Sequence, residues 1–279
     1  MALLGAHVSV AGGAHRAFER GLEIGCESLQ IFVKNANRWH ARAFAEDEVA
    51  AFHEQAERTG LSVVAHAGYL INLAAVDPDV LDKSLAALTD ELERCDLLRV
   101  PGLVLHPGAH MGAGVEAGIE RVARSLDQVF AKLPNLRARV LLENTAGQGT
   151  TLGADFAELG AIVAAVDAPE RLGVCLDSCH AFVAGYDLRD EAGYQATLAA
   201  LDGAVGLERL SVVHLNDAKQ PLGSHKDRHA NILQGEIGRE FFALVVHDAR
   251  FEELPMVLET PLGDDKRGHA RDLETLRKL

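Results

Sequence analysis

The chain has 279 residues, 48% of them hydrophobic, and a formal net charge of −14. This length suits one large domain or two small ones, and the charge taken alone argues against a nucleic-acid partner, because such proteins usually carry a basic face. No apolar run approaches the roughly 20 residues that span a bilayer, and the N-terminus MALLGAHVSVAGG lacks the basic start of a signal peptide. We therefore expect a cytoplasmic protein with no membrane partner, whose cysteines are reduced.

Short apolar runs that are typical of buried strands recur along the chain between longer segments of helical period. The expected strands cover residues 3–8, 28–33, 61–66, 103–107, 139–144, 172–177, 211–216 and 255–260. Their near-continuous apolar character is typical of parallel strands that helices cover.

The segments between these strands carry helix signals. Asp77 and Pro78 suit the N-cap and first turn of a helix in which leucines then recur at three- and four-residue steps. Gly60 suits the end of a helix over about 46–59. Strands and helices that alternate in this way predict one α/β domain over residues 1–279, folded as a TIM (β/α)8 barrel. A doubly wound open sheet is the alternative, but the Gly-rich segment TAGQGTTLG (145–153) misses its dinucleotide-binding fingerprint.

Side chains that bind metals stand at the ends of consecutive expected strands and in the loops that follow. Because the carboxyl ends of barrel strands form one rim, these side chains would converge there. A single histidine or acid at such a position is often structural, but four carboxylates brought together repel one another unless cations compensate them. The set is His66, His106, Glu143, Asp177, His180, His214, Asp227, His229 and Glu259.

Imidazoles and carboxylates without a thiolate suit Zn²⁺, with Mn²⁺ or Fe²⁺ as alternatives at some sites. The set exceeds one tetrahedral site, so it predicts two or three ions with at least one bridging carboxylate. Cys175 lies two residues before Asp177 and therefore on the same side of the strand, one layer deeper, where we expect it to fill the barrel.

Several segments, in this order, make the chain similar to the endonuclease IV family of zinc-dependent AP endonucleases in base-excision repair. They are GAHVSVAGG, KNANRW, YLINLAA, LHPGAH, LLENTAGQGTTLG, GVCLDSCHAFVAGYDL, HLNDAK and DRH. The resemblance extends from residue 5 to about residue 260, and it implies a TIM barrel with three Zn²⁺ ions.

The resemblance also implies how the ligands are shared. His66, His106 and Glu143 would hold the first ion, and His180, Asp227 and His229 the third. The second ion would bind Glu143, the bridge, together with Asp177, His214 and Glu259. Glu143, Asp177 and Glu259 are expected to carry the catalysis.

The activity implied by the resemblance is hydrolysis of the phosphodiester 5′ to abasic sites in duplex DNA, which leaves a 3′-hydroxyl and a 5′-deoxyribose phosphate. A hydroxide that bridges two ions would be the nucleophile, and trimming of blocked 3′ ends is a further expected activity. We expect a monomer that associates with the nucleoid when it acts on DNA. Three Zn²⁺ ions would change the formal charge from −14 to −8, so the DNA-binding face must be local.

Tyr69 matches the intercalating tyrosine of the family, whereas Asn37 stands where the family has a DNA-penetrating arginine and Arg38 comes next. A second departure is Leu233-Gln234, where the family usually has a glycine and an acid. The expected DNA-binding residues are Lys34, Asn37, Arg38, Tyr69, Lys226 and Arg228.

Two other functions remain open from the sequence. A sugar isomerase or epimerase on the same barrel would use Glu143, Asp177, His214 and Glu259, but it leaves the other ligand-type residues without a role. The other possibility is a DNA- or metal-binding protein that has kept the site and lost turnover.

Overall fold

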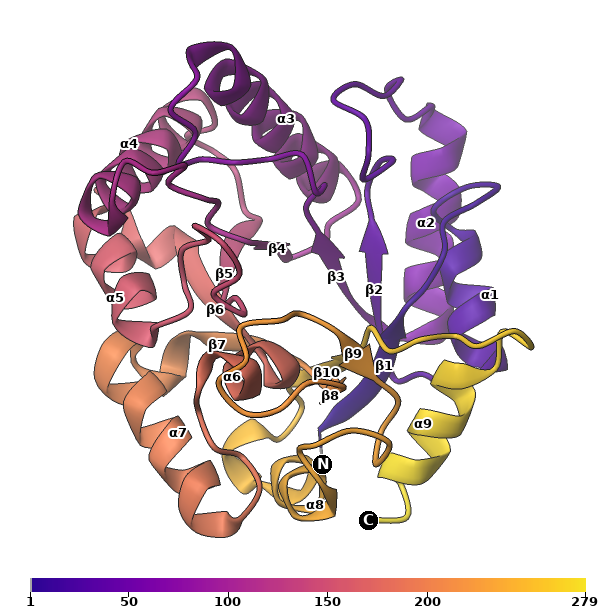
Figure 1. The fold of residues 1–279 in the computed structure, drawn as a ribbon. Coiled ribbons are helices and arrows are strands. Elements are labelled where there is room, and N and C mark those ends of the chain that lie inside the picture. Colours follow the sequence, from indigo (N-terminus) through magenta and orange to yellow (C-terminus); the bar gives the residue numbers. More distant parts are fainter. Residues whose placement is uncertain (1) are drawn as a thin grey trace.

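The strands form one closed parallel barrel in the computed structural model, which describes residues 2–279 (Figure 1). Around the barrel the strand order is β1-β10-β7-β6-β5-β4-β3-β2. The predicted TIM barrel is confirmed, and every predicted strand agrees with the observed one to within two residues at each end. The barrel strands are β1 (Leu3–His7), β2 (Ser28–Phe32), β3 (Ser62–His66), β4 (Gly102–Leu105), β5 (Arg139–Glu143), β6 (Leu172–Asp177), β7 (Leu210–His214) and β10 (Pro255–Leu258).

Helices surround the barrel as an outer ring (Figure 1). The Asp77 side chain accepts hydrogen bonds from the backbone N–H groups of Asp79 and Val80, and so caps α3 as predicted. Gly60 ends α2 with a left-handed φ of 67°, also as predicted. The helices are α1 (Arg16–Glu23), α2 (Glu46–Thr59), α3 (Pro78–Leu97), α4 (Val115–Lys132), α5 (Phe156–Ala165), α6 (Ser178–Ala184), α7 (Glu191–Val205), α8 (Arg239–His247) and α9 (Gly268–Leu276).

The buried apolar side chains form two clusters. The larger cluster lies between the strands and the outer helices. The smaller cluster fills the inside of the barrel with one side chain from each of six neighbouring strands, which confirms the interior position predicted for Cys175. Its members are Val64, Val104, Leu141, Cys175, Val212 and Val257.

A short antiparallel pair, β8 (Asp217–Ala218) and β9 (His229–Ala230), lies over the mouth of the barrel beside α6 (Figure 1). This pair closes the long loop that carries Asp227, and the sequence did not predict it. The buried Asp217 carboxylate stabilises the segment that follows β9. It accepts hydrogen bonds from the backbone N–H groups of Gly235 (2.9 Å) and Ile237 (3.1 Å). Leu233, at the departure from the family pattern, has a left-handed φ of 64°, a conformation that glycine adopts without strain.

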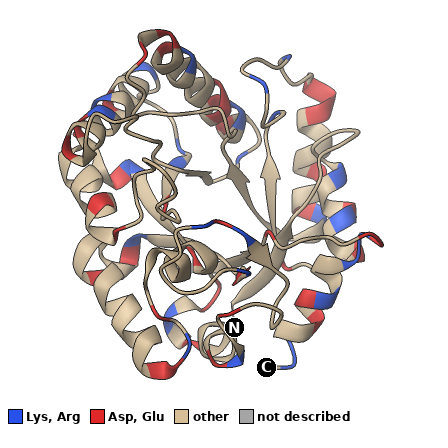
Figure 2. Ribbon diagram, viewed as in Figure 1, with Lys and Arg blue, Asp and Glu red and all other residues tan. Residues whose placement is uncertain are grey.

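Acidic and basic residues are mixed along the outer helices (Figure 2). Within residues 2–279, no helix has both the length and the apolar composition needed to cross a membrane.

The contact between α5 and α7 provides a test of the packing. A Cβ atom added at Gly160 would lie 2.4 Å from the backbone oxygen of Ala204, which cannot move aside easily. Gly160→Ala is therefore expected to lower the free energy of unfolding by about 1–3 kcal/mol, the usual cost of overpacking. Gly203→Ala is the matched control, because an added Cβ meets nothing within 4 Å there, and alanine should stabilise α7 by up to about 1 kcal/mol. Urea denaturation followed by circular dichroism measures both changes, and effects of the same sign would contradict the close contact.

Candidate metal centre

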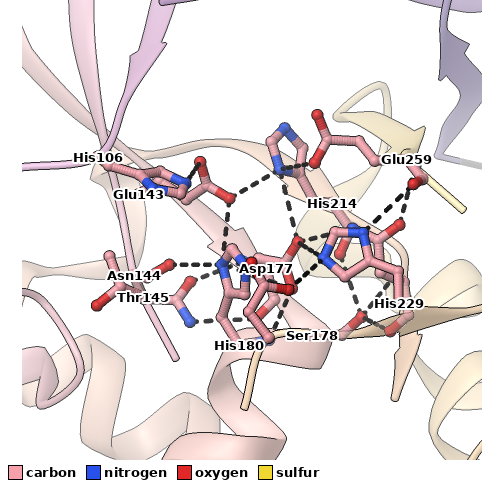
Figure 3. Close-up of polar contacts among 12 residues, drawn as sticks. His106, Glu143, Asn144, Thr145, Asp177, Ser178, His180, His214, His229 and Glu259 are labelled. Atoms are coloured by element: carbon pink, nitrogen blue, oxygen red, sulfur yellow. Dashed lines mark hydrogen bonds and ion pairs between the residues drawn. The ribbon is translucent and has the colours of Figure 1, made fainter. Parts of the chain in front are cut away.

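The ligand-type side chains predicted from the sequence meet at the carboxyl ends of the barrel strands. They form groups whose ligand atoms all lie within 4.8 Å of one another. Figure 3 shows the arrangement, with the Glu143 carboxylate between His106 and His214, and Asp177 between His214 and His229. The groups are His66-His106-Glu143, then Glu143-Asp177-His214-Glu259, then His180-Asp227-His229.

Glu143 belongs to two groups because its two oxygens face different partners. Oε2 lies 3.2 Å from His66 Nε2 and 2.9 Å from His106 Nε2. Oε1 lies 3.0 Å from His214 Nδ1. A carboxylate that offers one oxygen to each of two ligand groups has the geometry of a bridge between two cations.

The second group forms around His214 Nδ1. This atom lies 3.2 Å from Glu259 Oε2 and 3.7 Å from Asp177 Oδ2, in addition to its contact with Glu143. Three carboxylates and an imidazole that converge on one point leave room for a cation at their centre and call for its charge.

The third group combines His180 of α6 with Asp227, in the loop between β8 and β9, and His229 of β9. His180 Nε2 is 3.3 Å from Asp227 Oδ2, and His229 Nε2 is 3.3 Å from Asp227 Oδ1. His229 Nε2 is also a buried nitrogen without a hydrogen-bond partner among the described residues. A buried nitrogen that points at carboxylate oxygens without bonding them suits a metal ligand.

The electrostatics of the buried carboxylate agree with this geometry. Burial alone would raise the pKa of Glu143, but His106 and His214 outweigh burial and hold this pKa well below its usual value. Burial likewise opposes charge on His180, yet Asp177, Asp227 and Glu143 raise its pKa well above the usual value. The carboxylates thus attract positive charge into the cluster, and a metal ion competes with protons for these same atoms.

Two thiols also lie close to the cluster. Cys175 Sγ comes near Glu143 and His214, and Cys179 Sγ comes near Asp177 and His229. Burial raises the pKa of Cys175 to about 12 and that of Cys179 as well, so both thiols stay protonated at neutral pH. Since the thiolate is the form that binds metals, the oxygen and nitrogen ligands are the better donors here.

Two asparagines hold Asp177 and Glu259 in place. Asn144 brackets the backbone of Asp177, because it donates to the carbonyl (3.1 Å) and accepts from the N–H (2.7 Å). Asn216 donates to Asp177 Oδ2 at 2.7 Å and accepts from the N–H of Glu259 at 2.9 Å. The other oxygen of Asp177 accepts from the N–H of His180 and caps α6, so this carboxylate both caps a helix and faces the cluster.

Two further residues belong to the site and were not predicted from the sequence, namely Gln30 in β2 and His7 at the end of β1. Gln30 lies 2.7 Å from Glu259 Oε1, 2.8 Å from His214 Nε2 and 3.0 Å from His7 Nδ1. A glutamine in the middle of an apolar strand is the signal that could have identified it.

Most of the expected DNA-binding side chains lie at the surface beside the centre. Tyr69 is 66% exposed, and its ring packs against Phe32 and His66 with centroids 5.4 Å and 6.3 Å away. Its backbone N–H donates to Ala36 O at 3.0 Å, which joins Tyr69 to the loop that carries the other expected contacts. The exposed members of the set are Asn37, Arg38, Tyr69, Lys226 and Arg228.

Lys34 is not at the surface, so the expectation that it contacts DNA needs correction. Its side chain is 2% exposed, and its ammonium lies 3.0 Å from Asp90 Oδ2 and 3.3 Å from Glu91 Oε1, both in α3. It also donates to the carbonyl of Trp39 at 3.2 Å. Glu91 in turn accepts from the N–H of Gly68 at 3.0 Å. The contacts of Lys34 therefore stabilise the loop that carries Asn37 and Arg38, and its partner Glu91 stabilises the turn that carries Tyr69.

Comparison with known proteins agrees with the fold and identifies the family. The family described as a xylose isomerase-like TIM barrel matches residues 18–279. A Chloroflexus aggregans protein named probable endonuclease 4 is 49% identical over 280 residues, which cover 100% of this chain and 98% of that protein. The crystal structure of endonuclease IV from Thermus thermophilus has a TM-score of 0.88 and 40% identity, covering 99% of this chain and 98% of that one. A D-tagatose 3-epimerase-like protein has a TM-score of 0.75 at 18% identity, over 99% of this chain and 96% of that one, and shares the fold alone.

Replacing Lys34 tests the buried ion pair. Lys34→Met is expected to lower the free energy of unfolding by about 3–5 kcal/mol, because it leaves Glu91 charged and without its partner. Arg42→Met is the matched control, since Arg42 is 72% exposed in its pair with Glu48 and should matter little. Urea denaturation measures both variants. Equal effects of the two substitutions would show that the Lys34 pair is as weak as a surface pair.

Proposed function

Because the chain belongs to the endonuclease 4 family, we propose that it cuts the phosphodiester 5′ to abasic sites in duplex DNA, leaving a 3′-hydroxyl and a 5′-deoxyribose phosphate. The chain is a nuclease, and therefore a hydrolase, with the DNA-repair role of an AP endonuclease. The finer proposal is that residues 1–279 act as one domain and as a monomer on the nucleoid, and also trim blocked 3′ ends.

The observation that carries this proposal is the position of Glu143 between two groups of ligand atoms. The donor set fits Zn²⁺, which accepts imidazole nitrogen and carboxylate oxygen in tetrahedral sites. We propose one ion for each of the three groups, with Mn²⁺ or Fe²⁺ as alternatives at some sites. When bound, these ions would lower the pKa of a water molecule toward neutrality and neutralise charge on the scissile phosphate.

The protein's own residues would hold and orient the reacting groups. Glu143, Asp177 and Glu259 would fix the positions of the charges at which the phosphate binds. Through its amide, Asn216 would hold the Asp177 carboxylate and the Glu259 backbone in fixed positions relative to each other. The cluster borders a cavity of about 350 Å³ whose wall includes Phe32 and Tyr69, so a nucleotide turned out of the duplex would enter between aromatic rings and the ligands.

The exposed residues beside this cavity suit a damaged duplex. Tyr69 would enter the gap that a missing base leaves in the stack. Arg38 would enter the same region of the duplex from the adjoining loop. Lys226 and Arg228, on either side of Asp227, would contact the phosphates. These positively charged side chains would form the local DNA-binding face that a chain of net charge −14 requires.

A sugar isomerase or epimerase is the alternative on the same fold. It would use the four ligands of the second group only, whereas the structure brings His66 and His106 to Glu143 and joins His180 and His229 to Asp227. The greater part of the donor set favours the nuclease.

One experiment tests the proposal directly. The purified protein is expected to cut a duplex that contains one abasic site and to carry about three metal ions per chain by elemental analysis. Dialysis against a chelator should abolish cutting, and Zn²⁺ should restore it. An intact duplex of the same sequence is the control. One or two ions per chain, with no cutting, would favour the isomerase instead.

Replacing Tyr69 tests the contact with the stack. Tyr69→Ala is expected to weaken binding to the abasic duplex about tenfold or more, since stacking on an aromatic side chain contributes roughly 1–3 kcal/mol per base. Cleavage of a small, flexible phosphodiester should change little, because no base stack has to be held open. Tyr69→Phe keeps the ring and serves as the control. If Tyr69→Ala lowers both reactions equally, Tyr69 supports His66 or the fold rather than the DNA.

A further inference from the structure

The hydrogen bonds of Gln30 determine which way its amide points. Gln30 lies 2.7 Å from Glu259 Oε1, and an ionised carboxylate can only accept, so the amide nitrogen of Gln30 faces Glu259. The amide oxygen then faces His214 Nε2 at 2.8 Å, and this nitrogen must carry the proton. In the neutral imidazole, which is the form that binds metal, His214 Nδ1 then carries no proton and faces the carboxylates of the second ligand group.

The same amide determines the proton position on His7. The Gln30 amide nitrogen lies 3.0 Å from His7 Nδ1, and its second N–H is available for this contact. Two N–H groups cannot face each other at this distance, so His7 Nδ1 is the acceptor. The Glu259 Oε1 atom lies 3.3 Å from the same nitrogen, farther than the Gln30 amide, and does not change this assignment. The proton of His7 is therefore on Nε2.

His7 Nε2 has no partner within residues 2–279, although it is buried. The ring packs 4.3 Å from that of Phe32, and His7 lines the cavity of about 350 Å³ together with Tyr69, His66 and Glu259. A buried N–H without an acceptor is rare in native proteins and calls for an explanation. Here the ring that carries the unpaired donor lines the cavity in which the proposed substrate would lie.

We propose that His7 is a substrate-binding residue, whose Nε2–H donates a hydrogen bond to an oxygen of the abasic nucleotide. The inference rests on the proposed function. It adds a direct contact between a side chain and the substrate to the contacts that bound metal ions would make. Gln30 is the positioning residue that aligns both imidazoles, because one side of its amide sets the proton of His214 and the other side sets the proton of His7.

Two amide substitutions separate this role from a structural one. His7→Asn puts an amide near the position of Nδ1, so it can keep the contact with Gln30 but loses the donor at Nε2. His7→Gln extends its amide to the position of Nε2, so it keeps that donor and loses the acceptor. If His7 binds substrate, His7→Gln should keep more activity than His7→Asn. If His7 only supports Glu259, His7→Asn should keep more activity.

The measurements are kcat/KM for cutting an abasic duplex, affinity for a non-cleavable abasic duplex, and metal content. His7→Asn is expected to lower kcat/KM and affinity, with metal content unchanged. The loss should be about 2- to 10-fold if the acceptor is a neutral oxygen and about 10- to 100-fold if it is a charged phosphate. His7→Gln should recover most of the loss. His247→Gln, an exposed histidine at the end of α8, is the control and should behave as wild type.

The choice of abasic site identifies the oxygen. A natural abasic site carries a hydroxyl at C1′, and a tetrahydrofuran site lacks it. A loss confined to the natural site assigns the bond to this hydroxyl, and an equal loss on both substrates assigns it to a phosphate or ring oxygen. The proposal is overturned if His7→Asn equals or exceeds His7→Gln, or if either variant loses metal. Wild-type protein that cuts neither substrate would instead refute the proposed function itself.

Discussion

The arrangement of the site depends on one fully buried carboxylate, Glu143, surrounded by imidazoles. A carboxylate with no access to water needs positive charge or several donors around it. His66 and His106 face one oxygen and His214 faces the other, so the charge of Glu143 is compensated from two directions. These histidines come from β3, β7 and the loop that follows β4, and only a closed barrel brings them around the end of β5.

A layer of neutral amides lies behind the charged cluster. Asn144, Asn216 and Gln30 each join two elements of the barrel rim through paired hydrogen bonds. Gln30 bonds Glu259 Oε1 and His214 Nε2, which leaves Glu259 Oε2 and His214 Nδ1 to face each other in the second ligand group. An amide suits this position because it donates and accepts at once without adding charge. These hydrogen bonds within the fold therefore help to orient the ligand-type side chains.

The convergence of four of these ligand-type side chains could be predicted from the sequence, because each stands in a strong local pattern. His66, Glu143, Asp177 and His214 each end an apolar strand, and strand direction in a parallel barrel brings such ends together. Contacts between segments that are distant in the chain could not be predicted from the sequence. The sequence suggests phosphate contact for Lys34 because no residue near it in the chain shows that Asp90 and Glu91, in the second helix that follows, bind its ammonium. The β8–β9 pair escaped prediction for a related reason, since two residues on each side carry no periodicity.

The burial of Lys34 changes how an acidic chain would meet DNA. The charge of this lysine is used internally, to hold the loop of Arg38 against the turn of Tyr69, so it is not available to phosphate. Along the outer helices in Figure 2, acidic and basic residues are mixed. What remains at the rim is a few exposed cationic side chains around a cluster that itself attracts cations. In the proposed function, the metal ions would supply the concentrated positive charge and the loops would supply shape. In that proposal, specificity for a damaged site would follow from geometry at the rim, because the net negative charge of the protein opposes binding of DNA elsewhere.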